Sequence, residues 1–173
     1  MAKTALYGKK TSGGILAIES QDFTTGSRFF VHSGTGTDAS DGGDPDSPFK
    51  TIDYAVGKCT DSKNDIIYVM PGHTETVSAA AGLDLDVIGI RVVGLGQGAN
   101  RARVNFTTAV GADVDVDAAN IRMYNILFTG AIDALTGPID VNAADFWLIN
   151  CETRDVTGQA TDFIVTDANA DRL

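Results

Sequence analysis

The stretch Val116–Ile126, VDAANIRMYNI, decides the fold because near-copies of it lie on either side along the chain. Leu85–Leu95 reads LDVIGIRVVGL and Val141–Cys151 reads VNAADFWLINC, so successive copies start 31 and 25 residues apart. A fourth and weaker copy, VTDAN, starts at Val165. Each complete copy opens with an aliphatic residue and Asp or Asn, has Gly, Asn or Asp at its fifth position, and ends in six strand-like residues.

A repeat of about 25 residues made of short strands and turns is typical of one coil of a parallel β-solenoid. One coil cannot bury its inward side chains alone, but the coils above and below it can cover them. Asn125 and Asn150 occupy the same position in consecutive copies, where Gly94 stands in the first. Asn and Gly tolerate left-handed backbone, so we expect turns there, with amides that hydrogen-bond from coil to coil. The predicted fold class is all-β, a short parallel β-helix (solenoid).

The residues before the repeats have the features expected of a solenoid's first end. The loop Ser33–Ser47 is rich in Gly and Asp and must turn tightly. Apolar residues then recur at helical spacing after Thr51, which predicts a short helix near residues 51–60. The apolar run Asp65–Met70 follows and predicts a buried strand. Because an exposed first coil must be covered, we predict that the helix is an N-terminal cap.

Charge divides the chain of 173 residues into two unequal parts. Residues 1–28 carry four basic and two acidic side chains, a net charge of +2, which leaves −12 of the total −10 for residues 29–173. We therefore expect an extended N-terminal arm over 1–28 and a β-helix domain over 29–173. The acidic balance argues against nucleic acid as a partner. No apolar run approaches the roughly 20 residues of a membrane span. Cys59 and Cys151 fit no metal-ligand spacing, and we predict two buried free thiols.

The run Gly36–Cys59, GTDASDGGDPDSPFKTIDYAVGKC, followed by DIIYVMPG, resembles the opening of right-handed parallel β-helix proteins of the pectin-lyase-like type. Members often begin with a Gly-x-Asp loop, Pro-Phe-x-Thr-Ile, a short amphipathic helix, an apolar strand and Pro-Gly. The words TIDYA and IYVMPGH look most like a set of tailed-phage virion proteins. The resemblance covers roughly residues 29–150. Proteins of this fold include polysaccharide lyases, phage tailspikes and capsid decoration proteins, and the fold alone does not choose between them.

An enzyme of this fold would need carboxylates or a basic residue placed around a substrate groove. The candidate acids lie in one loop ahead of the first coil, where clustered oxygens could bind a structural calcium ion, although aspartates in glycine loops are more often turn formers. These acids are Asp38, Asp41, Asp44 and Asp46. His73 and Glu75 follow a Pro-Gly turn, and we expect His73 to cap that turn or the coil edge. Arg91 and Arg122 share one repeat position, which predicts a ladder on a solvated face. We predict no catalytic residues and no cofactor.

The resemblance therefore favours a phage virion structural protein, a capsid decoration (cement) protein that binds the outer capsid surface as an oligomer. It implies the major capsid protein and further copies of the chain, as a homotrimer, as partners. The expected location is the virion surface after synthesis in the host cytoplasm. The alternative is a tailspike or tail-fibre fragment that binds or cleaves host polysaccharide. The capsid-binding residues predicted in the arm are Lys3, Leu6, Tyr7, Lys9, Lys10, Ile15, Leu16 and Ile18.

Overall fold

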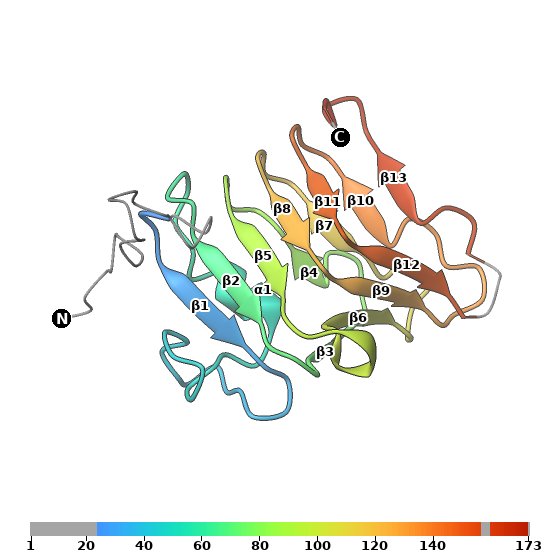
Figure 1. Cartoon of the computed structure of the whole chain (residues 1–173). Coiled ribbons are helices and arrows are strands. Elements are labelled where there is room, and N and C mark those ends of the chain that lie inside the picture. Colours follow the sequence, from blue (N-terminus) through green and yellow to red (C-terminus); the bar gives the residue numbers. More distant parts are fainter. Residues whose placement is uncertain (1–23, 157–159, 173) are drawn as a thin grey trace, which may run out of the picture.

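The computed structural model describes residues 24–156 and 160–172, which form a parallel β-solenoid (Figure 1). Three parallel sheets run along it, and we call them the first sheet (β1-β2-β5-β8-β11), the second sheet (β3-β6-β9-β12) and the third sheet (β4-β7-β10-β13). The all-β solenoid predicted from the repeats is confirmed. The strands are β1 (Arg28–Val31), β2 (Ile66–Val69), β3 (Thr74–Val77), β4 (Leu83–Asp84), β5 (Arg91–Gly94), β6 (Arg103–Phe106), β7 (Val114–Val116), β8 (Arg122–Tyr124), β9 (Leu127–Gly130), β10 (Ile139–Val141), β11 (Trp147–Ile149), β12 (Glu152–Asp155) and β13 (Ile164–Thr166).

Each coil contributes one strand to each of the three sheets. Coil 1 is β2, β3 and β4, coil 2 is β5, β6 and β7, coil 3 is β8, β9 and β10, and coil 4 is β11, β12 and β13. All neighbouring strands pair in parallel, so Val92 lies beside Met123, and Met123 beside Leu148. Equivalent positions of successive repeats therefore stack in rows that follow the solenoid axis.

The interior is a continuous column of apolar side chains. Val92 and Met123 from the first sheet, Val104 and Phe128 from the second, and Val114 from the third are all fully buried. Side chains alternate between the two faces of a strand. Strands β5, β6, β7 and β10 accordingly bury every second residue and leave the residues between them half-buried. The neighbouring coils cover each buried layer, which is why the coils are stable only as a stack.

The fourth repeat begins one residue later than its sequence pattern predicts. Val116 pairs with Val141, as the second and third copies require. Val141 pairs with Thr166, however, and not with Val165. Thr166 stands where the earlier copies have an aliphatic residue, so the apolar pattern alone points to the neighbouring valine. The corrected register also places Asp167 opposite Asn142, which restores the order of an opening residue followed by Asp or Asn.

The predicted asparagine ladder is confirmed. Asn125 and Asn150 have φ angles of 54° and 53°, in the left-handed region. The Asn125 amide donates hydrogen bonds to the carbonyl oxygens of Gly94 at 2.9 Å and Gly96 at 3.0 Å. The Asn150 amide donates in turn to Asn125 Oδ1 at 3.2 Å. The ladder therefore connects coils 2, 3 and 4 at one corner of the solenoid.

The N-terminal end of the stack is covered by β1 and by α1 (Ile52–Val56). β1 extends the first sheet by one strand, and the following loop protects its free edge, because Phe30 N donates to Gly42 O and Phe49 N donates to Phe30 O, both at 2.8 Å. Thr51 caps α1 by accepting a hydrogen bond from Tyr54 N at 3.2 Å. The helix contacts β1, β2 and β4, a position consistent with the predicted cap.

α1 is shorter than the sequence pattern predicts. It ends at Val56, whereas helical spacing continues to Cys59. Gly57 is its C-terminal cap, with a backbone N–H that donates to Asp53 O and Ala55 O. The other helical element is the single 3₁₀ turn η1 (Gly98–Asn100). Within the described residues, no helix has the length and apolar character needed to cross a membrane.

Candidate functional site

The outer face of the first sheet presents two rows of side chains. We define the basic row as the outward residues Arg28, Ile66, Arg91, Arg122 and Trp147, which are register partners on adjacent strands. The apolar row beside it is Phe30, Tyr68, Val93, Tyr124 and Ile149, all of which are half-buried. Within the apolar row, Phe30 stacks on Tyr68 with ring centroids 5.4 Å apart. The face thus combines aromatic and guanidinium groups on one sheet.

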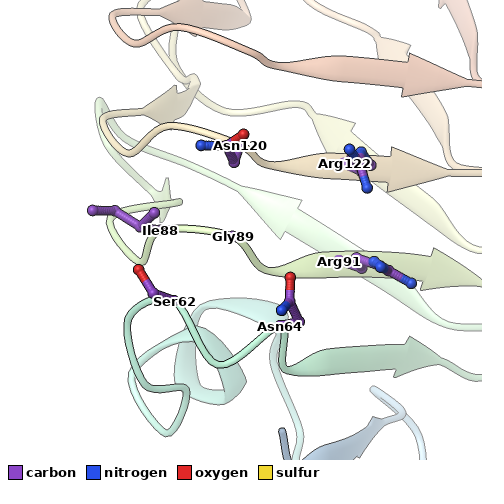
Figure 2. A pocket seen from close by; sticks show the side chains of 7 residues that line it. All are labelled: Ser62, Asn64, Ile88, Gly89, Arg91, Asn120 and Arg122. Atoms are coloured by element: carbon purple, nitrogen blue, oxygen red, sulfur yellow. The ribbon is translucent and has the colours of Figure 1, made fainter. Parts of the chain in front are cut away.

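A hollow of about 220 Å³ lies at the start of the strands on this face (Figure 2). Figure 2 shows Arg91 and Arg122 side by side on neighbouring strands, with Asn64 and Asn120 on either side of Gly89. The residues that line the hollow are Ser62, Asn64, Ile88, Gly89, Arg91, Asn120 and Arg122. No acidic side chain is among them, so the lining offers guanidinium, amide and hydroxyl groups.

The hollow exists because of one glycine in a second left-handed ladder. Two residues before β2, β5, β8 and β11 of the first sheet, the chain turns with positive φ: 57° at Asn64, 81° at Gly89, 61° at Asn120 and 60° at Asp145. Coil 2 has glycine at this position, whereas the coils on either side have asparagine. A Cβ at Gly89 would come no closer than 3.8 Å to its nearest neighbour, Ser62 Cα. The space between the two asparagines is therefore open, and a side chain at residue 89 would enter it.

Arg91 and Arg122 are half-buried, and within the described residues neither forms an ion pair. The ion pairs that the described arginines make involve Arg101, Arg154 and Arg172. Arg122 lies over the ring of Trp147, with Cζ 5.9 Å from the centroid. Like charges directly opposite each other on paired strands are destabilising. Two adjacent guanidiniums with free donors are suited to binding carboxylate or phosphate oxygens through paired hydrogen bonds.

A row of the opposite charge lies on the third sheet. We define the acidic row as Asp84, Asp115 and Asp140, which are register partners on β4, β7 and β10. Burial and, after it, four neighbouring carboxylates together raise the pKa of Asp115 to about 6. Those carboxylates belong, in decreasing order of effect, to Asp117, Asp113, Asp140 and Asp84.

The acidic row has few compensating groups among the described residues. The Asn142 amide donates to Asp115 Oδ1 at 2.6 Å and to Asp117 Oδ1 at 3.0 Å. Burial also raises the pKa of both Asp84 and Asp140, and nearby aspartates add to the effect. Asp84 Oδ1 is buried without a hydrogen-bond partner. The row therefore carries negative charge that nothing in this part of the chain balances.

The structure places the four candidate calcium ligands in separate turns of one loop. Asp41 Oδ1 accepts from Gly43 N at 3.2 Å, Asp44 Oδ1 from Asp46 N at 2.8 Å, and Asp38 Oδ1 from Lys50 N at 3.0 Å. The first two are the turn-forming contacts that aspartates in glycine loops usually make, and the third joins the two ends of the loop. Within residues 24–156 and 160–172, no group of three or more His, Cys, Asp or Glu side chains is arranged to hold a metal ion.

His73 and Glu75 form a buried pair that joins the cap to coil 1. His73 Nδ1 accepts a hydrogen bond from Ser33 N at 3.0 Å, so the ring proton is on Nε2 and faces Glu75 Oε2 at 3.0 Å. Glu75 Oε2 also accepts from Ile52 N, the first residue of α1, at 2.7 Å. Both side chains are buried, with exposed fractions of 1% and 7% for the two residues. Their contacts hold the loop and the helix in place, as the capping interpretation of His73 expects.

The predicted arm residues from Lys3 to Ile18 lie outside the described part of the chain. Both cysteines are free, as predicted, but they are half-buried and not fully buried. Burial raises the pKa of the Cys59 thiol to about 12, and the Asp65 carboxylate adds to the effect, so this thiol stays protonated.

Sequence reasoning found the arginine ladder but missed the acidic row. Arg91 and Arg122 are indeed register partners on adjacent strands. The signal for the acidic row was present, because an aspartate directly precedes the residue that opens each of the first three repeats. The hollow could not be read from the repeats, since it depends on where the left-handed turns stack.

Comparison with known proteins finds no relative of this chain. No protein-family model, no curated protein and no solved structure matches the chain.

Proposed function

We propose that the protein is a phage virion structural protein, a capsid decoration protein that binds the outer capsid surface as an oligomer. The observation that carries the proposal is the outer face of the first sheet, where a row of aromatic and aliphatic side chains lies beside guanidinium groups. Aromatic and arginine side chains are the types most enriched in protein interfaces. The link to phage virions rests on the resemblance of the run that begins at Gly36.

The capsid-binding segment in this proposal is the N-terminal arm. Its described end is attached to coil 1, because Ser27 N donates to Asp65 Oδ1 at 2.5 Å. Asp65 Oδ2 accepts at the same time from Thr60 N at 2.7 Å. The arm therefore reaches the solenoid at the first sheet, next to Arg28. In this proposal the arm binds the capsid, and the outer face of the first sheet is a surface through which copies of the chain associate.

We also propose that the protein cleaves no polysaccharide. The carboxylates of the glycine-rich loop serve turns, and both ring nitrogens of His73 are in hydrogen bonds inside a buried pair. We expect incubation with pectate, alginate or capsular glycans to release no unsaturated or reducing ends. Turnover that is lost after Asp38→Ala, Asp41→Ala or Asp44→Ala would contradict this proposal.

A second candidate is a tailspike or tail-fibre fragment that binds host polysaccharide. The hollow at Gly89 favours it, because amides, a hydroxyl and two guanidiniums can bind sugar hydroxyls and an acidic group. Trp147, exposed by 48% beside Arg122, could stack on a sugar ring. This candidate predicts glycan binding by the isolated protein, which the decoration role does not need.

The deciding experiment is co-sedimentation of the purified protein with capsids that lack it. We expect saturable binding of the full chain and a large loss of binding for a variant that lacks residues 1–23. The deletion stops before Thr24, so it preserves the hydrogen bond from Gly26 N to Thr24 Oγ1 and the one from Ser27 N to Asp65 Oδ1. Circular dichroism of the shortened chain should match the full chain. Glycan binding without capsid binding would favour the second candidate, and full occupancy by the shortened chain would exclude the arm as the anchor.

A further inference from the structure

We propose that the basic row of one copy binds the acidic row of a second copy, so that solenoids associate side by side with parallel axes. The inference rests on the oligomer of the proposed function and names the two surfaces that make it. It does not depend on capsid binding, and it can be tested with the purified chain alone.

The first argument is that each row lacks compensation within its own copy. Arg91 and Arg122 are adjacent, half-buried, and without an ion pair among the described residues. Asp115 and Asp140 are likewise adjacent and half-buried, and the Asn142 amide donates a hydrogen bond to Asp115 alone of these two. Repetition stacks like charges in both rows, which costs stability in an isolated copy. Contact between the two rows would offset both repulsions at once.

The second argument is that the two rows match rung by rung. Arg91 and Asp115 both belong to coil 2, and Arg122 and Asp140 both belong to coil 3. Two copies at the same height along their axes therefore bring each guanidinium to the level of one carboxylate, within the ~4.8 Å spacing of neighbouring strands. Arginine and carboxylate groups can then form paired hydrogen bonds.

Coil 4 continues the match with apolar residues. Trp147 continues the basic row and is exposed by 48%, and Val165 continues the acidic row and is exposed by 41%. In the same arrangement these two side chains meet at one level. Coil 1 adds little, because Ile66 is fully buried and Asp84 Oδ1 is buried beside the cap. The contact would thus consist of two charged rungs and one apolar rung.

The third argument concerns the symmetry of the contact. The two rows lie on different sheets, so when two copies have bound, one of them keeps a free acidic row and the other keeps a free basic row. Such a heterologous contact forms a closed ring when the rotation between copies returns to the start. In a ring whose axis is parallel to the solenoid axes, neighbouring copies are not shifted along that axis. Coil 2 of one copy therefore lies at the level of coil 2 of the next. The trimer that the resemblance implies is one ring of this kind.

The test uses two charge-reversed variants of the full chain. One carries Arg91→Glu and Arg122→Glu, so that both faces are acidic, and the other carries Asp115→Arg and Asp140→Arg, so that both faces are basic. Sedimentation velocity over a dilution series should give a closed oligomer for the unchanged protein. We expect each variant alone to be monomeric, with self-affinity lower by roughly 100-fold or more, since close opposite charges across interfaces couple strongly. A mixture of the two variants should associate again, because each acidic row then meets a basic row.

Controls separate this contact from general effects of charge or folding. Lys50→Glu with Lys63→Glu makes the same change in net charge outside both rows and should leave association unchanged. Two neutralising variants should weaken association without reversing charge: Arg91→Gln with Arg122→Gln, and Asp115→Asn with Asp140→Asn. Urea unfolding should show that every variant still folds cooperatively.

Three results would overturn the proposal. One is an unchanged protein that stays monomeric at every concentration, and another is an oligomer that survives either reversal. The third is a mixture of the two variants that fails to associate. This includes the case in which the mixture stays monomeric and the glutamate variant loses binding to capsids or acidic glycans. An unchanged protein that binds capsids but does not associate would reject this inference alone, whereas an unchanged protein that associates but does not bind capsids would reject the decoration role alone.

Discussion

Substitutions of Asn125 should separate the two contributions that its side chain makes to the solenoid. Asn125→Gly keeps a residue that tolerates the φ of 54°, but it removes the amide that bonds to Gly94 O and Gly96 O. Each of these hydrogen bonds contributes about 1 kcal/mol net, so we expect a loss of about 2 kcal/mol. The bond that Asn125 Oδ1 accepts from the Asn150 amide is exposed, so water replaces it and its loss adds little. Asn125→Ala loses the same bonds and must also hold a β-carbon in the left-handed region, which costs about 1 kcal/mol more. We expect about 3 kcal/mol for the alanine variant.

Asn120 is the matched control for this comparison. Its φ of 61° is similar, but the structure gives its side chain no hydrogen bond. Asn120→Gly should therefore change the free energy of unfolding by less than about 0.5 kcal/mol, as is usual for surface substitutions. Asn120→Ala should cost about 1 kcal/mol from left-handed strain alone. The difference between alanine and glycine should thus be similar at the two positions, while the glycine variants should differ by the two amide bonds.

Urea unfolding followed by far-ultraviolet circular dichroism measures these differences, provided that the slope with urea is the same for all variants. The reasoning about the amide ladder fails if Asn125→Gly is within about 0.5 kcal/mol of the unchanged protein. The reasoning about strain fails if alanine and glycine are equivalent at both positions.

Three further predictions concern other positions of the described chain. Gly42→Ala should destabilise the fold by about 3 kcal/mol or more, because its Cβ would lie 2.2 Å from Phe49 Cε2 at a φ of 64°. Gly43→Ala has no neighbour closer than 4.0 Å and should be neutral in the same urea measurement. Ala134→Gly should raise the thermal midpoint, since Ala134 is exposed and has a φ of 60°, and an unchanged or lower midpoint would contradict this. Asp115→Asn should stabilise the monomer by about 1 kcal/mol at pH 7 and have no effect near pH 4. The raised pKa of about 6 means that the stabilising protonated form of Asp115 is lost as pH rises through 6. The figure of about 1 kcal/mol allows for solvent screening of a partly exposed carboxylate. Unfolding curves at several pH values would refute it if the two proteins differ equally at pH 4 and 7.

The sequence predicted the elements that repeat, because repetition itself carries the information. Three near-copies with asparagine at one position were enough to expect stacked coils and an amide ladder, and the register of Val116 with Val141 agrees. The prediction failed where a residue departs from the pattern. Thr166 opens the fourth repeat, but the neighbouring Val165 fits the apolar pattern better, so the predicted start is one residue too early. In a strand such an error changes the face of every side chain, so it matters more than its size suggests.

The candidate site was less accessible to sequence reasoning than the fold. The rows depend on which residues become neighbours across coils, and the spacing between coils is 31 residues in one case and 25 in another. The hollow depends on Gly89 having no side chain at a position where its neighbours in the stack, Asn64 and Asn120, have one. A lone glycine within a repeat indicates a turn, but its consequence for the surface appears only when the coils are aligned.

The acidic row connects the stability of one copy to the assembly of several, with opposite dependence on pH. In an isolated copy, Asp115 faces the carboxylates of Asp84, Asp113, Asp117 and Asp140 and the amide of Asn142, so its protonation below pH 6 removes repulsion and stabilises the fold. Binding to Arg91 of a second copy requires the same carboxylate to be ionised, so association should strengthen as pH rises from 5 to 7 while the unfolding free energy of the monomer falls. An acidic row that balanced its charge within one copy would make both quantities insensitive to this range. Repulsion within the acidic row therefore destabilises an isolated copy and is offset when a partner binds. The unfolding free energy and the association, measured on the same preparation below and above the association concentration, should depend on pH with slopes of opposite sign.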